Sequence, residues 1–157
     1  MLDPTTFRSV LGRVASGVSV ITTVTADGRD HGMTATALCS LSLDPPLILI
    51  CVDRAATIHP HLAPAAKFAV SLLAREQEPL SRRFAETRDD RFDGVAYTRA
   101  LTGCALVTDA LAHLECTMWA QYAGGDHTIF VGHVVRAVAR DAAPLLYYRG
   151  GYAALDT

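Results

Sequence analysis

Two long β-rich segments, residues 112–122 and 128–140, are separated by only five residues, which contain the turn sequence Gly124-Gly125-Asp126. This spacing leaves no room for a crossover helix, so the two segments are expected to run antiparallel as one long hairpin. Further β-rich runs occur at residues 18–25, 47–52, 68–73 and 105–108, and several are bounded by turn residues. We therefore expect a mainly β chain, an antiparallel β-barrel with peripheral helices. The alternative, a doubly wound α/β sheet, needs a crossover helix after each strand.

Three segments predict the helical parts. Apolar residues recur at helical spacing near the N-terminus, between Pro4 and a stop at Gly17: Phe7, Val10, Leu11 and Val14. Residues 76–87 predict a short helix, and residues 55–66 have the composition of a helix-like loop. These helical segments are expected to lie at the periphery of the barrel.

Residues 31–42 are rich in small and hydroxyl-bearing side chains and are expected to be extended. Pro45-Pro46 ends this stretch, and the apolar run 47–52 then predicts a strand buried on both faces. Small side chains let a flat heteroaromatic ligand approach the backbone, and hydroxyl groups can meet a phosphate. On composition alone an ordinary Ser/Thr-rich edge strand is the favoured interpretation.

The bulk composition narrows the class of protein. A chain of 157 residues, half of them hydrophobic and 19% charged, fits one globular domain. Its 14 basic and 16 acidic residues argue against a nucleic-acid partner. The first residues lack a signal-peptide pattern, and the longest apolar run, 47–52, is too short to cross a bilayer. We expect a cytoplasmic protein with no membrane partner.

No short motif assigns a chemistry. The chain has no G-x-G-x-x-G after a strand, no P-loop, no G-x-S-x-G and no H-E-x-x-H. His59 and His61 flank Pro60 without a third ligand nearby, so a solvated loop is expected there and no metal site. The four cysteines lie far apart in apolar or β-branched runs, which indicates buried free thiols.

Six blocks of sequence, spread over nearly the whole chain, carry a resemblance to a known family. They are FRSVLGRVASGVSVIT, GMTATALCSLSLDPPLILICVDR, FAVSLL, LSRRFA, LECTMWAQYAGGDHTIFVGHV and PLLYYRGGY. In this order they resemble the flavin reductases, FMN-binding split-barrel proteins that serve as reductase components of two-component monooxygenases. The resemblance implies a Greek-key antiparallel split barrel, with one flavin reductase-like domain over residues 1–157. It also implies hydride transfer from NADH or NADPH to FMN or FAD, a homodimer, and a separate flavin-dependent monooxygenase as partner.

The resemblance also implies site residues. The flavin ring is expected along the stretch from Thr34 to Ser40, largely through main-chain groups. Beyond Thr34, the residues expected at the ring are Ala35, Thr36, Ala37, Ser40, Cys51, Val52 and Asp53. The phosphate is expected at Thr57, Arg83, Arg91 and Phe92. His127 is expected to assist at the nicotinamide, near Tyr148 and Arg149. The chain has Thr36-Ala37 where the family's common pattern has Asn-Ser.

Two other functions stay open at this point. One is a split-barrel flavoprotein oxidase of the pyridoxamine phosphate oxidase type, and the other is a non-enzymatic flavin- or haem-binding module. The choice between FMN and FAD also stays open. The choice between NADH and NADPH stays open as well, since the sequence shows no recognisable site for a 2′-phosphate.

Overall fold

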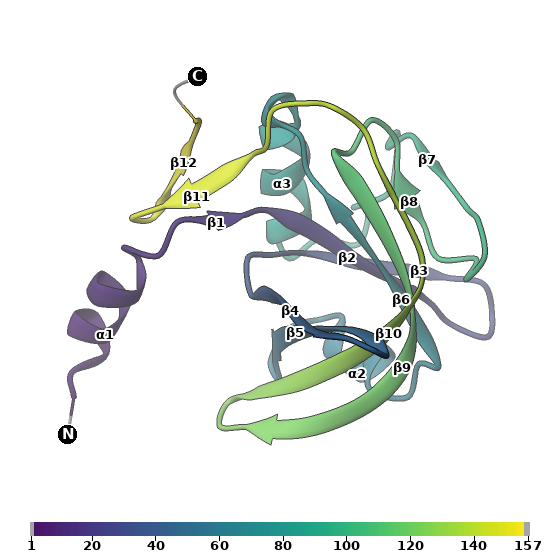
Figure 1. The fold of residues 1–157 in the computed structure, drawn as a ribbon, viewed down its shortest axis with the longest axis horizontal. Coiled ribbons are helices and arrows are strands. Elements are labelled where there is room, and N and C mark those ends of the chain that lie inside the picture. The colour runs from purple at the N-terminus through teal and green to yellow at the C-terminus, as the bar shows by residue number, and fades with distance from the viewer. Residues whose placement is uncertain (1, 156–157) are drawn as a thin grey trace.

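The computed structural model describes residues 2–155 and is dominated by one curved antiparallel sheet (Figure 1). Its seven strands lie in the order β3-β2-β6-β9-β10-β5-β4, and every pairing is antiparallel. They are β2 (Ser19–Val24), β3 (Asp30–Ala35), β4 (Leu38–Leu43), β5 (Pro46–Asp53), β6 (Lys67–Leu72), β9 (Ala112–Gly124) and β10 (His127–Ala139). The predicted mainly β fold and the predicted long hairpin β9–β10 are confirmed.

Smaller elements surround this sheet. A three-stranded sheet contains β1 (Ser16–Gly17), β11 (Leu146–Tyr148) and β12 (Gly151–Ala153), and β7 (Tyr97–Thr98) pairs with β8 (Leu106–Val107). The helices are α1 (Pro4–Leu11), α2 (His59–Leu62), the 3₁₀ helix η1 (Arg75–Gln77) and α3 (Glu78–Ala85). Helix α1 ends earlier than the predicted stop at Gly17, because Ser16 and Gly17 pair with β11 instead.

The strands β3 and β4 are consecutive in the chain but lie at opposite edges of the seven-stranded sheet. The predicted single extended stretch over residues 31–42 is therefore two strands. The short connection Thr36-Ala37 joins them, and Leu38 N donates to Thr36 O at 3.0 Å within it. Since each of the two strands has a free edge here, the barrel is open along this connection.

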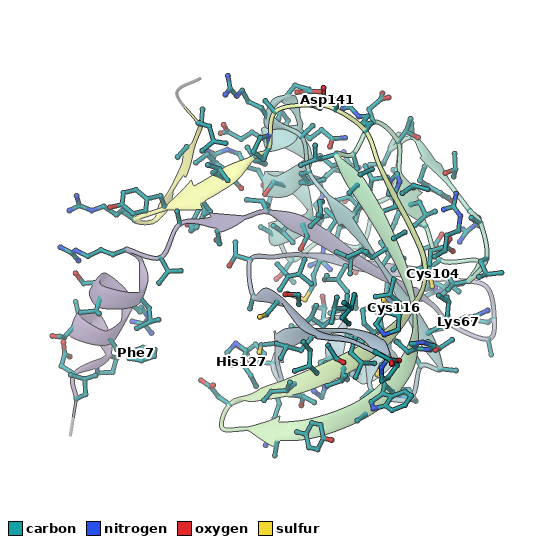
Figure 2. The ribbon with its side chains drawn as sticks, in the orientation of Figure 1. Phe7, Lys67, Cys104, Cys116, His127 and Asp141 are labelled. Atoms are coloured by element: carbon teal, nitrogen blue, oxygen red, sulfur yellow. The ribbon has the colours of Figure 1, made fainter. Side chains whose placement is uncertain are left out.

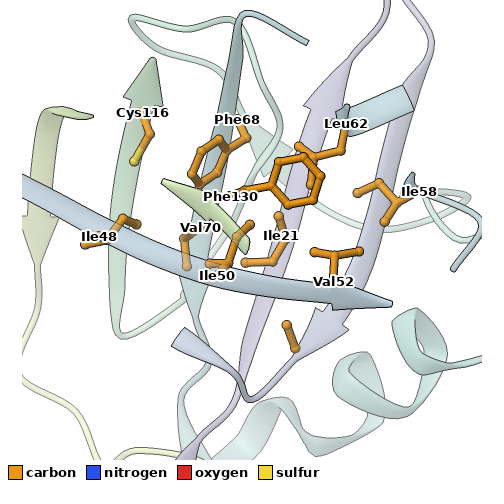
Figure 3. Close-up of a cluster of buried hydrophobic side chains, with 11 residues drawn as sticks. Ile21, Ile48, Ile50, Val52, Ile58, Leu62, Phe68, Val70, Cys116 and Phe130 are labelled. Atoms are coloured by element: carbon orange, nitrogen blue, oxygen red, sulfur yellow. The ribbon is translucent and has the colours of Figure 1, made fainter. Parts of the chain in front are cut away.

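The main core lies inside the curve of the sheet. It includes Ile21, Ile50, Val52, Phe68 and Phe130, each fully buried (Figure 3). Strand β5 alternates between buried and half-exposed positions, so the prediction that residues 47–52 are buried on both faces was wrong. The reason is that β5 has one face on the core and the other outside, the usual pattern in an antiparallel sheet.

A buried acid ties a loop to the sheet. The side chain of Glu115 on β9 is fully buried, and its Oε1 accepts hydrogen bonds from Thr102 N at 2.7 Å and Thr102 Oγ1 at 2.8 Å. Its Oε2 lies 3.2 Å from Arg136 Nη1 on β10. Burial opposes ionisation of Glu115, but these partners outweigh it and hold its pKa below the ordinary value.

All four cysteines are free thiols, as predicted, but only two of them are fully buried. Cys104 and Cys116 are buried, and burial raises the pKa of the Cys116 thiol to about 12. Cys39 is exposed on the edge strand β4, and Cys51 is half-buried because it lies on the outward face of β5. Within residues 2–155, no helix is both long enough and apolar enough to cross a membrane.

Candidate functional site

The open edge of the barrel presents main-chain groups to solvent. Thr36 and Ala37 are exposed, and Ala37 O accepts a 3.1 Å hydrogen bond from Cys51 N on β5. Strand β3 is an edge strand, so the N–H and C=O groups along its outer side have no neighbouring strand. Such a backbone edge can pair with the polar rim of a flat heteroaromatic ring.

Three other residues predicted to lie at the flavin ring, Thr34, Ala35 and Val52, use their side chains for contacts within the fold. Thr34 Oγ1 donates a 2.6 Å hydrogen bond to Ser81 O, which fixes α3 against β3. Ala35 and Val52 pack into the main core, so only their backbone is available to a ligand. Ser40 on β4 is exposed.

Thr57 and Arg91, 34 residues apart in the chain, meet at one point beside β3. Arg91 Nη1 donates to Thr57 Oγ1 at 2.9 Å and to Gly32 O at 3.0 Å. Its Nε donates to Glu86 O at 2.8 Å, and its Nη2 also donates to that oxygen. All of these partners are neutral and burial lowers the pKa of the guanidinium, so an anion would be favoured here.

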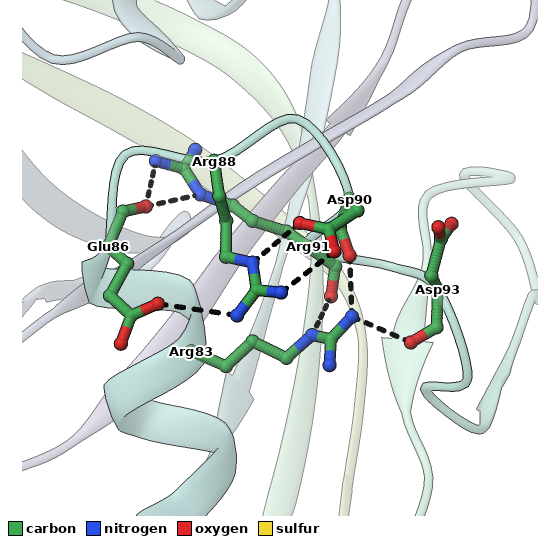
Figure 4. A network of polar contacts seen from close by, with 6 residues as sticks. All are labelled: Arg83, Glu86, Arg88, Asp90, Arg91 and Asp93. Atoms are coloured by element: carbon green, nitrogen blue, oxygen red, sulfur yellow. Dashed lines mark hydrogen bonds and ion pairs between the residues drawn. The ribbon is translucent and has the colours of Figure 1, made fainter.

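Arg83 holds the loop that carries Arg91 (Figure 4). Arg83 Nε donates to Arg91 O at 2.7 Å, and its Nη2 donates to Asp90 O at 2.5 Å and to Asp93 O at 2.7 Å. In the same loop Arg88 binds Asp90 through two hydrogen bonds and holds the pKa of that carboxyl at about 2. The Arg83 guanidinium is therefore engaged with backbone oxygens and positions Arg91.

Gly32 lets β3 approach the aromatic side chains beneath it. A Cβ at this position would lie 2.7 Å from Phe84 Cε1 and 3.0 Å from Phe92 Cζ. The two phenylalanine rings pack edge to face, with 5.0 Å between their ring centroids. Phe92 is thus partly a packing residue for β3, and it also lines the neighbouring cavity.

That cavity has a volume of about 520 Å³ and contains the Thr57–Arg91 pair. Two further lining residues, His31 on β3 and His61 on α2, stack at 3.5 Å between ring centroids. Both rings are partly buried, and His59 Nε2 lies 2.9 Å from Thr128 Oγ1. The prediction of a solvated loop at His59 and His61 was therefore wrong. Sequence reasoning missed His31, since nothing local links it to a residue 30 positions away.

A larger cavity of about 750 Å³ lies along α3 and contains only Arg83 of the predicted site residues. It is lined by apolar and charged side chains such as Leu80, Arg82, Val95 and Val107. Three predicted phosphate residues, Thr57, Arg91 and Phe92, line the smaller cavity, so we assign the phosphate end of the site there.

His127 opens β10 at the turn of the long hairpin. It lies opposite Asp53 at the end of β5, two residues beyond Cys51. His127 Nδ1 lies 2.7 Å from Asp126 Oδ1, and this contact lowers the pKa of Asp126. A carboxylate at Nδ1 favours the proton on that nitrogen and leaves Nε2 free to accept. The structure thus brings His127 to the same end of the barrel as Ala37.

Tyr148 and Arg149 lie in the C-terminal hairpin, apart from this group. Arg149 N donates to Gly12 O at 2.8 Å, and Tyr152 OH lies 2.7 Å from Ser81 Oγ. These contacts attach the hairpin to α1 and α3. Among residues 2–155, no hydrogen bond joins Tyr148 or Arg149 to His127.

Comparison with known proteins gives a consistent picture. Residues 11–156 match the family described as the flavin reductase like domain. The flavin reductase (NADH) of Kitasatospora aureofaciens is 40% identical over 98% of this chain and 82% of its own length. The flavin-dependent monooxygenase reductase subunit HsaB of Rhodococcus jostii is 35% identical over 99% of this chain and 80% of its own length. Among solved structures, a Streptomyces globisporus NADH:FAD oxidoreductase in complex with NAD and FAD fragments superposes with a TM-score of 0.93, at 38% identity over 99% of this chain and 96% of that one.

Proposed function

The chain belongs to the flavin reductase like domain family, and from that premise we propose how its residues serve the reaction. The protein is an NAD(P)H-dependent flavin reductase with a split-barrel fold, and it uses FMN or FAD together with NADH or NADPH.

We assign the ring of the flavin to the open barrel edge. The exposed backbone at Thr36 and Ala37 fits the polar rim of the ring, with Cys51 and Asp53 at the end of the neighbouring β5. The flavin supplies the acceptor for the hydride that a reduced nicotinamide donates. The protein needs no acid or base for this transfer, so its residues chiefly bind and orient.

We assign the flavin phosphate to Thr57 and Arg91. The Thr57 hydroxyl and the Arg91 guanidinium lie 2.9 Å apart beside Gly32, and together they offer a cation and a hydroxyl to one phosphate group. Arg83 keeps the 90–93 loop in place, and Phe92 packs against the strand. The meeting of Thr57 with Arg91 is the single observation that carries the assignment of the site.

We assign the nicotinamide to the end of the barrel that carries His127. The Asp126 carboxylate orients the imidazole, which leaves Nε2 as an acceptor for the amide of a nicotinamide. Tyr148 and Arg149, on the exposed C-terminal turn, are the remaining candidates for this face.

We infer a homodimer from surfaces that this chain leaves uncovered. Helix α1 has no buried residue and stands away from the barrel (Figures 1 and 2), with Phe7 53% and Val10 57% exposed. An eight-residue helix is not stable by itself in water. Trp119 and Tyr122 on the long hairpin are also more than half exposed. A second copy would cover such apolar residues.

A separate protein is expected to consume the reduced flavin. One relative that matches nearly the whole chain is named as the reductase subunit of a flavin-dependent monooxygenase. We infer that this chain likewise supplies reduced flavin to a monooxygenase encoded as its own polypeptide.

Steady-state assays test this assignment. Oxidation of NADH and of NADPH is followed with FMN, FAD and riboflavin as acceptors, and the visible spectrum of the purified protein shows whether flavin stays bound. We expect turnover that saturates in both nicotinamide and flavin. Absence of turnover with every pair would contradict the function, and riboflavin turnover with the same KM as FMN would contradict the phosphate site.

A further inference from the structure

The cavity beside Thr57 and Arg91 is larger than a single phosphate group requires. Its volume of about 520 Å³ lies within the range of pockets that enclose whole small molecules. Beyond the Thr57–Arg91 pair, its lining continues to His31, His61 and Arg29. A ligand that ended at its first phosphate would leave this part empty.

The direction of β3 indicates which part of a ligand would lie there. The proposed ring position is at Thr36, just after β3, and the proposed phosphate position is level with Gly32, four residues earlier. A strand rises about 3.3 Å per residue, so Arg29 lies roughly 10 Å further in the same direction. FMN ends at the first phosphate, whereas FAD continues with a second phosphate and an adenosine.

The charges in this part of the cavity suit a second phosphate. The Arg29 side chain is exposed and makes no hydrogen bond or ion pair with any residue in the range 2–155. Of the two acids in the lining, Asp30 is bound by Arg99 through contacts of 2.8 and 2.6 Å, and Asp89 is exposed. Within residues 2–155, Arg29 is thus a positively charged side chain of the lining that no acid binds.

The stacked histidines offer a surface for a purine. The His31 and His61 rings are nearly parallel, at 15°, and both line the cavity. Burial, His61 and Arg29 lower the pKa of His31, so this imidazole is neutral near pH 7. Imidazole rings can stack on a heteroaromatic ring or exchange hydrogen bonds with it.

We propose that this cavity binds the diphosphate and adenosine of FAD through Arg29, His31 and His61, and that the protein therefore prefers FAD to FMN. The inference rests on the proposed placement of the flavin phosphate at Thr57 and Arg91.

Equilibrium binding tests the proposal without any turnover. Oxidised FAD and FMN are titrated by calorimetry into the full chain and into Arg29→Gln, His61→Gln and the charge-matched control Lys67→Gln, whose side chain is exposed and lies outside the cavity lining. We expect the unmodified chain to bind FAD about tenfold more tightly than FMN. Arg29→Gln should weaken FAD binding about fivefold and FMN binding less than about twofold. His61→Gln should act in the same direction, and Lys67→Gln should change neither affinity.

Equal losses for the two flavins, or no loss with either cavity variant, would overturn the proposal. The Arg29 side chain is exposed and has no partner within residues 2–155, so Arg29→Gln tests the cavity even if His61→Gln disturbs packing. Failure of the inference is distinct from failure of the proposed function. A chain that reduces both flavins but binds them equally retains the function and loses the inference. If the chain binds FAD through Arg29 but neither nicotinamide reduces the bound flavin, the inference is retained and the proposed function is lost.

Discussion

His127 lies directly opposite Asp53 in the antiparallel ladder between β10 and β5, and so the turn of the long hairpin stands at the same end of the barrel as the connection Thr36-Ala37. Residues that are more than 70 positions apart in sequence become neighbours only through this pairing. The hairpin therefore places the His127 side chain at the end of the barrel to which we assign the nicotinamide.

Replacing His127 should affect the nicotinamide and spare the flavin. For His127→Ala we expect the KM for the nicotinamide to rise about tenfold, or turnover to slow by a similar factor, because one hydrogen bond to the substrate is lost. Flavin affinity, measured by titration, should stay within about twofold. His133→Ala, on the same strand and packed against Trp119, serves as the matched control. Unchanged kinetics for His127→Ala would remove His127 from the site.

Removing the phosphate partners should weaken the flavin selectively. Arg91→Lys keeps a positive charge but loses the bonds to Glu86 O and Gly32 O, and Thr57→Ala loses one exposed hydroxyl. We expect the KM for flavin to rise about tenfold or more in Arg91→Lys and about threefold in Thr57→Ala, with kcat less affected.

Thr98→Ala, another exposed threonine outside the cavity lining, controls for loss of a surface hydroxyl. Riboflavin has no phosphate, so its reduction should be insensitive to Thr57→Ala. Equal losses with FMN and riboflavin would contradict the phosphate assignment.

Glu115 should contribute stability that depends on pH. Its pKa is lower in the folded chain than in the unfolded chain, so its contribution is present above the ordinary value of 4.5 and is lost as the pH falls through the folded value. For Glu115→Gln we expect the free energy of unfolding to drop by about 2 kcal/mol at neutral pH. Urea unfolding at several pH values should show this difference shrinking below about pH 4.

Asp141→Asn provides the comparison for Glu115→Gln, because Asp141 is exposed and makes no hydrogen bond or ion pair within the described part of the chain. A difference for Glu115→Gln that stayed constant down to the acid transition would show that ionisation of Glu115 does not stabilise the fold.

The exposed apolar side chains of helix α1 predict a homodimer. Phe7→Asp places a charge on the exposed apolar face of α1, and we expect it to shift the chain from dimer to monomer in analytical ultracentrifugation. Arg8→Asp changes charge on the same helix without removing an apolar side chain and should leave the dimer largely intact. A monomeric unmodified chain would contradict the homodimer.

Much of the fold could be predicted because its signals are local. The turn at Gly124-Gly125-Asp126 and the β-rich runs around it determine the hairpin. The opening between β3 and β4 could not be seen, since residues 31–42 carry one continuous extended pattern and only the pairing with β2 and β5 divides it. The alternating burial of β5 was missed for a related reason, because a run of Leu and Ile also fills the outer face.

Some of the candidate site could likewise be predicted. The family resemblance implies Thr57, Arg91 and His127 as site residues, and the structure brings the first two into contact. The roles of Arg83 as a clamp on the loop and of Gly32 as the point of close approach depend on contacts with residues distant in sequence. The stack of His31 on His61 has no sequence signature, since each histidine alone is an ordinary polar residue.

Anaerobic rapid mixing of the protein and FAD with NADH or NADPH follows the loss of the flavin's visible absorbance in a single reduction, and so separates hydride transfer from every later step. We expect rapid bleaching whose rate saturates with the nicotinamide and falls in His127→Ala. Bleaching by an amine donor but by neither nicotinamide would contradict it and favour an oxidase of the pyridoxamine phosphate type. Bound flavin that no donor bleaches would contradict it in favour of a binding module.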